Sequence, residues 1–181
     1  MNVQESVRGL TVVNVVATAE LKQPVSLVLL RSVESFHYDP SGYHCAYFKD
    51  VKTIGKVSIF GTGKMISVAA RKFEDAENDL EHAKNVLAGL GLIKDVKIKV
   101  QLQNTVITAD LGHTFDLAGF AGRPDVVYEP EQFPAAIYHP EELEGASVLV
   151  FASGKVVFSG IKRADFANVC ESVLRKLSYL G

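Results

Sequence analysis

The chain has 181 residues, 48% of them hydrophobic, and a formal net charge of −2. This composition supports a packed core and excludes an intrinsically disordered chain. It also excludes attraction to nucleic acid through overall charge, so a nucleic-acid binder of this composition must gather its basic residues on one face.

The first half of the chain predicts a strand, a short helix, four strands and a long helix, in that order. The strands are expected over residues 10–17, 36–38, 43–49, 56–60 and 64–70. Pro24 favours the start of the short helix, which is expected to run to about Ser32. The long helix is expected over residues 74–88, because four apolar residues share one side of it: Ala76, Leu80, Ala83 and Leu87.

The second half of the chain predicts the same order of elements. Its strands are expected over residues 97–107, 126–128, 135–138, 146–151 and 155–161, and its short helix over residues 115–121. The closing helix is expected over residues 163–177, with an apolar stripe of Phe166, Val169, Val173 and Leu177. Only residues 91–96 link the halves, which is too short a linker for independent domains.

An internal repeat explains this order. The segment from Asn14 to Leu21 recurs from Asn104 to Leu111, at an offset of 90 residues. Phe60-Gly61-Thr62-Gly63-Lys64 recurs as Phe151-Ala152-Ser153-Gly154-Lys155, at an offset of 91 residues. We therefore expect an α+β fold of two pseudo-symmetric repeats, residues 1–92 and 93–181, which form one continuous antiparallel sheet with helices on one face.

The other face of this sheet is expected to be open and to carry an unusual set of side chains. Strand alternation places Asn14, Val16 and Thr18 on one side, and the second copy repeats this with Asn104 and Val106. Such a face is half apolar and almost uncharged. It suits the minor groove of DNA, whose A·T pairs offer hydrogen-bond acceptors to an asparagine donor. The alternative is that each asparagine is a feature of a β-bulge or of a sheet edge.

Three segments resemble the TATA-box-binding protein family. Residues 128–134, Tyr-Glu-Pro-Glu-Gln-Phe-Pro, resemble its stirrup segment, and residues 148–162 resemble its strand pair around Phe-x-Ser-Gly-Lys. Residues 103–106, Gln-Asn-Thr-Val, resemble its first strand. The match covers both repeats, and the short acidic core is similar to archaeal members. The resemblance implies a curved, saddle-shaped sheet with helices on its convex face.

The same resemblance implies a function in transcription. Members of the family bind double-stranded A·T-rich promoter DNA, the TATA box, in the minor groove, bend it, and recruit transcription factor B and RNA polymerase. The resemblance implies no catalysis, cofactor or metal. It implies a location in the cytoplasm, at the archaeal nucleoid, or in the nucleus of a eukaryote. No apolar run approaches the roughly 18 residues of a membrane span, no secretory signal is evident, and both cysteines are expected to be reduced.

The resemblance also implies roles for individual residues. Those expected to face the bases and the groove floor are Asn14, Val16, Ile66, Val68, Asn104, Val106, Leu149, Val157 and Ser159. The expected aromatic wedges are Tyr43, Phe60, Phe133 and Phe151. The expected phosphate contacts are Lys49, Lys64, Arg71, His139, Lys155 and Lys162. Glu129 and Glu131 are expected to meet transcription factor B, although without the resemblance they indicate only a solvated acidic turn.

Departures from the family pattern lie mostly in the first repeat. Tyr43 stands where the second repeat has Phe133, Ser58 replaces a leucine of the family, and Val68 replaces a threonine. We therefore expect the first half to grip A·T steps more weakly or to read a relaxed sequence. This leaves a second hypothesis open, a paralogue that mainly docks proteins. Homodimerisation through the open face in the absence of DNA is a further expectation.

Other constellations indicate no chemistry. Gly61-Thr62-Gly63-Lys64 lacks the first glycine and the final Ser or Thr of a phosphate-binding loop, so a hairpin turn is expected. His37, His44 and Cys45 lack the partners of a zinc site. The acidic stretch 74–79 is expected to be a helix N-terminus enriched in acids, which the helix dipole favours, and His82 is expected on the surface. An enzyme accessory domain ranks last, because the chain has no room for a catalytic domain.

Overall fold

The structure is a computed structural model that describes residues 9–180. The first elements are β1 (Thr11–Glu20), the 3₁₀ helix η1 (Leu27–Ser32), β2 (Phe36–His37), β3 (Cys45–Phe48), β4 (Lys56–Phe60), β5 (Lys64–Ala70) and α1 (Phe73–Gly89). The next are β6 (Gln101–Asp110), α2 (Leu117–Phe120), β7 (Val126–Val127), β8 (Ala135–Tyr138), β9 (Ser147–Phe151), β10 (Lys155–Ile161) and α3 (Ala167–Ser178). The order of elements agrees with the sequence-based expectation in both halves.

By packing, the chain forms two compact units. The N-terminal unit comprises residues 14–103, and the C-terminal unit comprises residues 104–180 with the described residues up to 13. The repeat boundary expected between residues 92 and 93 stays a prediction. Across the described residues the strands are hydrogen-bonded in the order β2-β3-β4-β5-β1-β6-β10-β9-β8-β7.

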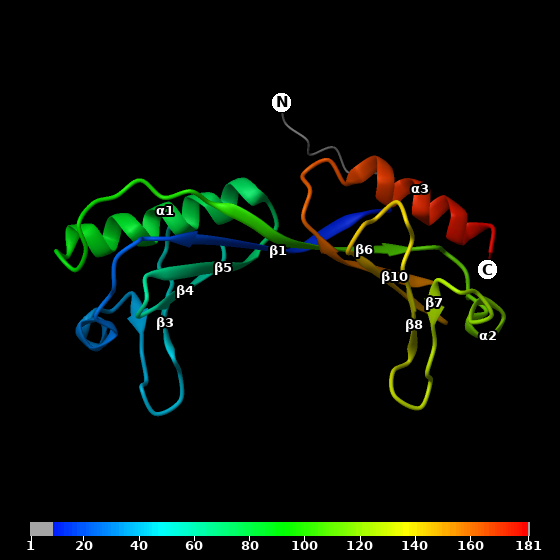
Figure 1. The fold of residues 1–181 in the computed structure, drawn as a ribbon, viewed down its shortest axis with the longest axis horizontal. Coiled ribbons are helices and arrows are strands. Elements are labelled where there is room, and N and C mark those ends of the chain that lie inside the picture. The colour runs from blue at the N-terminus through cyan, green and yellow to red at the C-terminus, as the bar shows by residue number, and fades with distance from the viewer. Residues whose placement is uncertain (1–8, 181) are drawn as a thin grey trace. The chain divides into compact units, whose positions relative to one another are not determined.

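In the N-terminal unit, α1 packs on β4 and β5 (Figure 1). The apolar stripe expected for this helix is confirmed, because all four of its members are fully buried: Ala76, Leu80, Ala83 and Leu87. The sheet contributes Val57, Ile59 and Met65 to the same core, all with no exposed surface. The loop between β2 and β3 extends from the opposite side of the sheet (Figure 1). The helix therefore covers one face of this sheet.

In the C-terminal unit, α3 covers β6, β9 and β10 through Cys170, Val173 and Leu177, which lie in one core with Ile107 and Phe158. Burial raises the pKa of the Cys170 thiol to about 12. Cys45 is also buried, and both cysteines are free thiols, as expected. These cysteines are therefore packing residues.

Several predicted ends were wrong. The short helix begins at Leu27 rather than Pro24, because the backbone up to Ser26 is still extended. β6 begins at Gln101 rather than residue 97, and β1 continues to Glu20. The closing helix begins at Ala167 rather than residue 163, after a turn in which the Arg163 guanidinium donates to the Asp165 carboxylate at 2.6 and 2.7 Å.

The turns between β4 and β5 and between β9 and β10 are true hairpin turns, as predicted. Gly63 and Gly154 adopt φ values of 91° and 85°, and each donates its N–H to the carbonyl of the aromatic residue that begins the turn. A Cβ on Gly63 would lie 2.1 Å from the Gln23 carbonyl oxygen. This close approach requires glycine, so these residues are structural and do not form a phosphate loop.

Candidate nucleic-acid interface

The face of the sheet opposite the helix is half-exposed in each unit, and we call it the open face. In β1, the half-buried Asn14 and Val16 alternate with the buried Val15 and Ala17. The same alternation in the other strands leaves the remaining predicted groove residues half-buried: Ile66, Val68, Asn104, Val106, Leu149, Val157 and Ser159. Both units therefore carry this predicted set on the open face, while its contact with bases stays a prediction.

Each asparagine that is predicted to contact bases accepts a hydrogen bond from a residue of a β-bulge. Asn14 Oδ1 accepts a hydrogen bond from the Ala69 N–H at 2.8 Å, and Asn104 Oδ1 accepts one from the Gly160 N–H at 2.8 Å. Ala69 and Gly160 have φ values of 68° and 86°, and the strand register shifts beside both. The alternative interpretation, in which each asparagine is a feature of a β-bulge, is therefore confirmed.

This bond fixes what each amide can do on the open face. A backbone N–H can only donate, so the asparagine atom that faces it must be the amide oxygen. The Nδ2 group then keeps two N–H donors, and no hydrogen bond within residues 9–180 uses them. Each unit thus presents one oriented donor among aliphatic side chains. Such a donor complements the N3 and O2 acceptors of an A·T pair in the minor groove.

The predicted wedges of the C-terminal unit form an aromatic pair. The rings of Phe133 and Phe151 have centroids 6.2 Å apart at an interplanar angle of 64°. Phe133 is 40% exposed although it is a large apolar side chain in a loop. Because Ala135 pairs with Phe151 across β8 and β9, the strand register brings the loop residue Phe133 to this site.

The N-terminal unit arranges its aromatics differently. Tyr43, 45% exposed, packs edge-on against Tyr47 with ring centroids 5.2 Å apart. Tyr47 lies directly opposite Ser58, and Lys56 Nζ lies 4.1 Å from the centroid of its ring. The neighbouring Cys45 and partial burial raise the pKa of Tyr47, so its phenol stays neutral. A large aromatic side chain therefore lies beside Ser58 on the open face.

Sequence reasoning missed Tyr47 and its counterpart Ile137. The alternation in Cys45-Ala46-Tyr47-Phe48 and the offset of 90 residues were available as signals. Ile137 pairs with Leu149 as Tyr47 pairs with Ser58. The open face of each unit thus contains one more large side chain than the sequence indicated.

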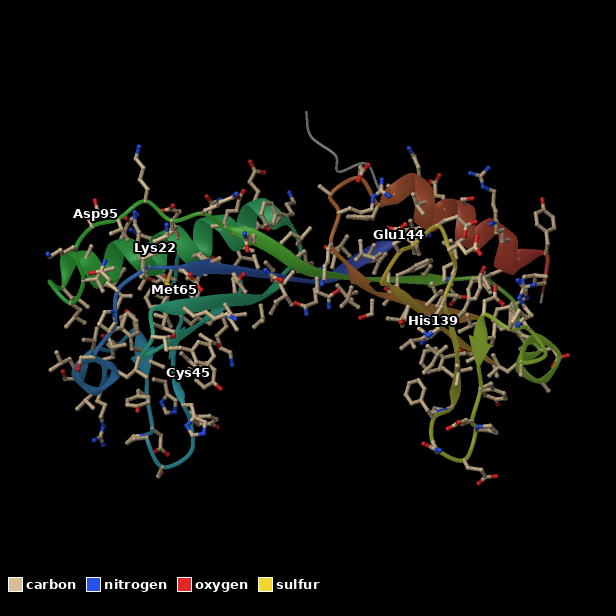
Figure 2. All side chains as sticks on the ribbon, viewed as in Figure 1. Lys22, Cys45, Met65, Asp95, His139 and Glu144 are labelled. Atoms are coloured by element: carbon tan, nitrogen blue, oxygen red, sulfur yellow. The ribbon has the colours of Figure 1, made fainter. Side chains whose placement is uncertain are left out.

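The predicted ionic contacts are all solvent-exposed. The predicted phosphate contacts all have exposed side chains: Lys49, Lys64, Arg71, His139, Lys155 and Lys162. His139 begins the segment after β8, where its Nδ1 lies 3.4 Å from Ser147 Oγ (Figure 2). Glu129 and Glu131 are exposed in the β7–β8 loop, whose turn is closed by the Glu129 carbonyl accepting from the Gln132 and Phe133 N–H groups. Exposed positions are compatible with the predicted contacts, which stay predictions.

Two residues of α1 have partners that the sequence did not indicate. Asp79 is 2% exposed and accepts hydrogen bonds from the Ile54 and Gly55 N–H groups at 2.9 and 2.7 Å. His82 is only partly exposed, and its Nε2 lies 2.7 Å from Asp50 Oδ2. Both side chains tie the β3–β4 loop to the helix. They are structural, and helix periodicity alone could not reveal their partners.

Within residues 9–180 no cluster of ligating side chains suits a metal ion. The same residues contain no helix with the length and apolar character that a membrane span requires.

The fold and site define a class of protein: a duplicated α+β platform with one oriented amide donor and an aromatic cluster on the open face of each unit. The family model described as "Transcription factor TFIID (or TATA-binding protein, TBP)" matches residues 9–90 and 99–180. The chain therefore belongs to the TATA-binding protein family of transcription factors.

Similar proteins support this assignment. The chain is 38% identical over 157 residues to the TATA-box-binding protein of Cenarchaeum symbiosum, covering 85% of each chain. It is 33% identical to that of Pyrococcus horikoshii, covering 95% of this chain and 91% of the relative. The solved structure of Methanococcus jannaschii TBP matches with a TM-score of 0.77 and 28% identity, over 94% of this chain and 99% of that one. The fold class and the archaeal resemblance are thereby confirmed.

Proposed function

We propose that this protein is a general transcription initiation factor that binds A·T-rich promoter DNA in the minor groove. One observation carries the proposal: the Asn14 and Asn104 oxygens are held by bulge N–H groups, so each asparagine amide presents only its Nδ2 donors on the open face. The minor-groove edge of an A·T pair offers only acceptors, whereas a G·C pair adds the guanine N2 donor. A donor-only reader therefore favours A·T pairs, and the names of the relatives support the same target.

The proposal includes bending of the duplex. Phe133 and Phe151 form an aromatic pair next to the open face, and Tyr43 and Phe60 hold the corresponding positions in the other unit. Unstacking a base step to admit an apolar wedge costs about a few kcal/mol. TATA-binding proteins are themselves a known example of such wedges. The kinked duplex then covers more protein, which offsets that cost.

The proposal also includes partners. Glu129 and Glu131 are exposed on the β7–β8 loop, and an acidic loop of this kind suits a basic surface of transcription factor B, which in turn brings RNA polymerase. The protein would act in the cytoplasm, at the archaeal nucleoid. In the absence of DNA the half-apolar open face would favour a homodimer, which sedimentation at several protein concentrations can detect.

The test compares an A·T-rich promoter duplex with a G·C-rich duplex of equal length, with and without transcription factor B. Anisotropy reports affinity, and energy transfer between end labels reports bending. The proposal predicts that the A·T-rich duplex is bound more tightly than the G·C-rich duplex and is bent. Transcription factor B is expected to raise the affinity for the A·T-rich duplex further, and Glu129→Gln and Glu131→Gln are expected to reduce this gain in affinity. Phe133→Ala is expected to reduce bending more than Tyr43→Ala. Equal, unbent binding of both duplexes would contradict the proposal.

The second candidate function is a protein-docking module with relaxed DNA recognition. Ser58 in the groove and the packing of Tyr43 on Tyr47 favour it, because both reduce the apolar surface free to enter a groove in the N-terminal unit. In the same experiment this candidate predicts weak, equal affinity for both duplexes together with tight binding of transcription factor B. The two candidates therefore give opposite results with DNA alone.

A further inference from the structure

A hollow of the N-terminal unit gathers four lysines that the sequence analysis did not bring together. We call it the lysine hollow. Its charged lining consists of Lys22, Lys64, Lys97, Lys99 and Glu20, in a volume of about 490 Å³. Lys22 follows the end of β1 (Figure 2), whereas Lys97 and Lys99 precede β6. The hollow borders the open face, because Thr18 and Lys64 also line it.

The charge of the hollow is strongly positive. Four lysines against one glutamate leave +3, in a chain whose net charge is −2. No salt bridge within residues 9–180 involves any of these four lysines, and the nearby Asp95 is paired with Lys84 at 3.3 Å. An excess of positive charge on one surface attracts anionic ligands.

Among the residues that the structure describes, the lining of the corresponding hollow of the C-terminal unit does not have this charge. It is lined by Thr108, Asp110, Lys155 and Val157, so one lysine is balanced by one aspartate. By the repeat offset of 90 residues, Lys22 corresponds to Gly112 and Lys99 to Gly9. Within the described residues the repeat therefore supplies a counterpart hollow whose lining has no net charge.

The backbone at Lys22 supports a functional role. Lys22 has a φ of 55°, in the left-handed region, and its counterpart Gly112 has a φ of 77°. A non-glycine residue in this region is strained, and strain that persists where glycine would serve is associated with function. A Cβ at Gly112 would meet nothing within 4 Å. The positive φ of this turn therefore comes from its local backbone and not from crowding by neighbouring residues.

We propose that the lysine hollow is a phosphate-binding site for the DNA backbone, which grips the duplex more strongly at the N-terminal unit. This inference rests on the proposed function. Each lysine that neutralises a phosphate releases counterions and steepens the dependence of affinity on salt by about 1 in the log–log slope. The hollow thus offsets the apolar area lost at Ser58, and the N-terminal unit, which the sequence indicated to be the weaker half, gains electrostatic affinity.

The test measures binding of the A·T-rich and G·C-rich duplexes over about 50 to 200 mM salt, where counterion release is readily resolved. The variant is Lys22→Gln/Lys97→Gln/Lys99→Gln. Its control, Arg31→Gln/Lys72→Gln/Arg175→Gln, removes the same charge from exposed residues outside the open faces. The proposal predicts that the lysine variant lowers the slope by about 3 for both duplexes and keeps the A·T preference, and that the control changes the slope by less than about 1.

A single variant separates binding from folding. Lys22→Gly relieves the backbone strain, so it is expected to raise the melting temperature while it lowers DNA affinity severalfold and the salt slope by about 1. Gly112→Lys is expected to lower the melting temperature and to raise both the DNA affinity and the salt slope.

Three outcomes overturn the inference. The first is a lysine variant with the slope of its control, and the second is Lys22→Gly with unchanged affinity. The third is that free polyglutamate binds the wild type but not the lysine variant while both proteins bind DNA equally, which would assign the hollow to an acidic protein segment. A lowered slope in a protein without A·T preference would instead support the hollow and contradict the proposed function.

Discussion

Replacing Asn104 by aspartate or by alanine separates its two structural roles. The carboxylate of Asn104→Asp can still accept the Gly160 N–H, which lies 2.8 Å from Oδ1 in the wild type, but it cannot donate. Alanine can do neither, and it leaves the Gly160 N–H without a partner. An unsatisfied group of this kind costs about 1 to 3 kcal/mol. We therefore expect Asn104→Ala to lower the free energy of unfolding by about that amount, and Asn104→Asp by less than about 0.5 kcal/mol.

DNA binding is expected to respond differently. Both variants lose the base donor, worth about 1 to 1.5 kcal/mol, so affinity for an A·T-rich duplex falls about five- to tenfold. Asn104→Asp falls further because its negative charge faces groove acceptors. Urea denaturation and anisotropy measure the two quantities, and Asn78→Asp, on the exposed side of α1, is the control for added charge. Wild-type affinity in Asn104→Asp, or equal loss of stability in both variants, would refute the reasoning.

Three further changes test the packing of the N-terminal unit. Ala69→Gly is expected to raise stability by about 0.5 to 1 kcal/mol, because Ala69 has a φ of 68°; an unchanged melting curve contradicts this. Ser67→Ala is expected to stabilise by about 1 kcal/mol, because the buried Ser67 Oγ has no partner in the described structure. Burial raises the pKa of Asp50, but hydrogen bonds from His82 and the Lys52 N–H hold it below its usual value. The contribution of Asp50 to the free energy of unfolding is therefore fully present above about pH 4 and is lost as pH falls through the lowered pKa. In Asp50→Asn the melting temperature should therefore fall less steeply as the pH is lowered.

The repeat made the fold predictable. Two copies with conserved strand alternation fix which face is covered by helices, so the open-face positions of Asn14 and Asn104 followed from the sequence. The apolar stripe of α1 followed from its 3.6-residue period. Element ends were less predictable, because the start of η1 and the start of α3 depend on local backbone bonds rather than on periodicity.

The details that orient the site depend on tertiary structure and do not follow from the sequence. Alternation does not indicate where a register shifts, so the pairing of Asn14 with the bulge at Ala69 was not visible in the sequence. The lysine hollow joins Lys22 to Lys97 and Lys99 across 75 residues of sequence or more. Such a cluster depends on tertiary proximity, which composition and spacing do not encode.

The most direct test of the central claim, donor readout of minor-groove acceptors, uses a duplex in which inosine–cytosine pairs replace the A·T pairs. Inosine–cytosine keeps the minor-groove acceptors of A·T without the guanine N2 donor, whereas its major groove has the pattern of G·C. Affinity measured by anisotropy should therefore be similar for the inosine and A·T duplexes and much weaker for the G·C duplex. Binding of the inosine duplex as weak as that of the G·C duplex would contradict the claim.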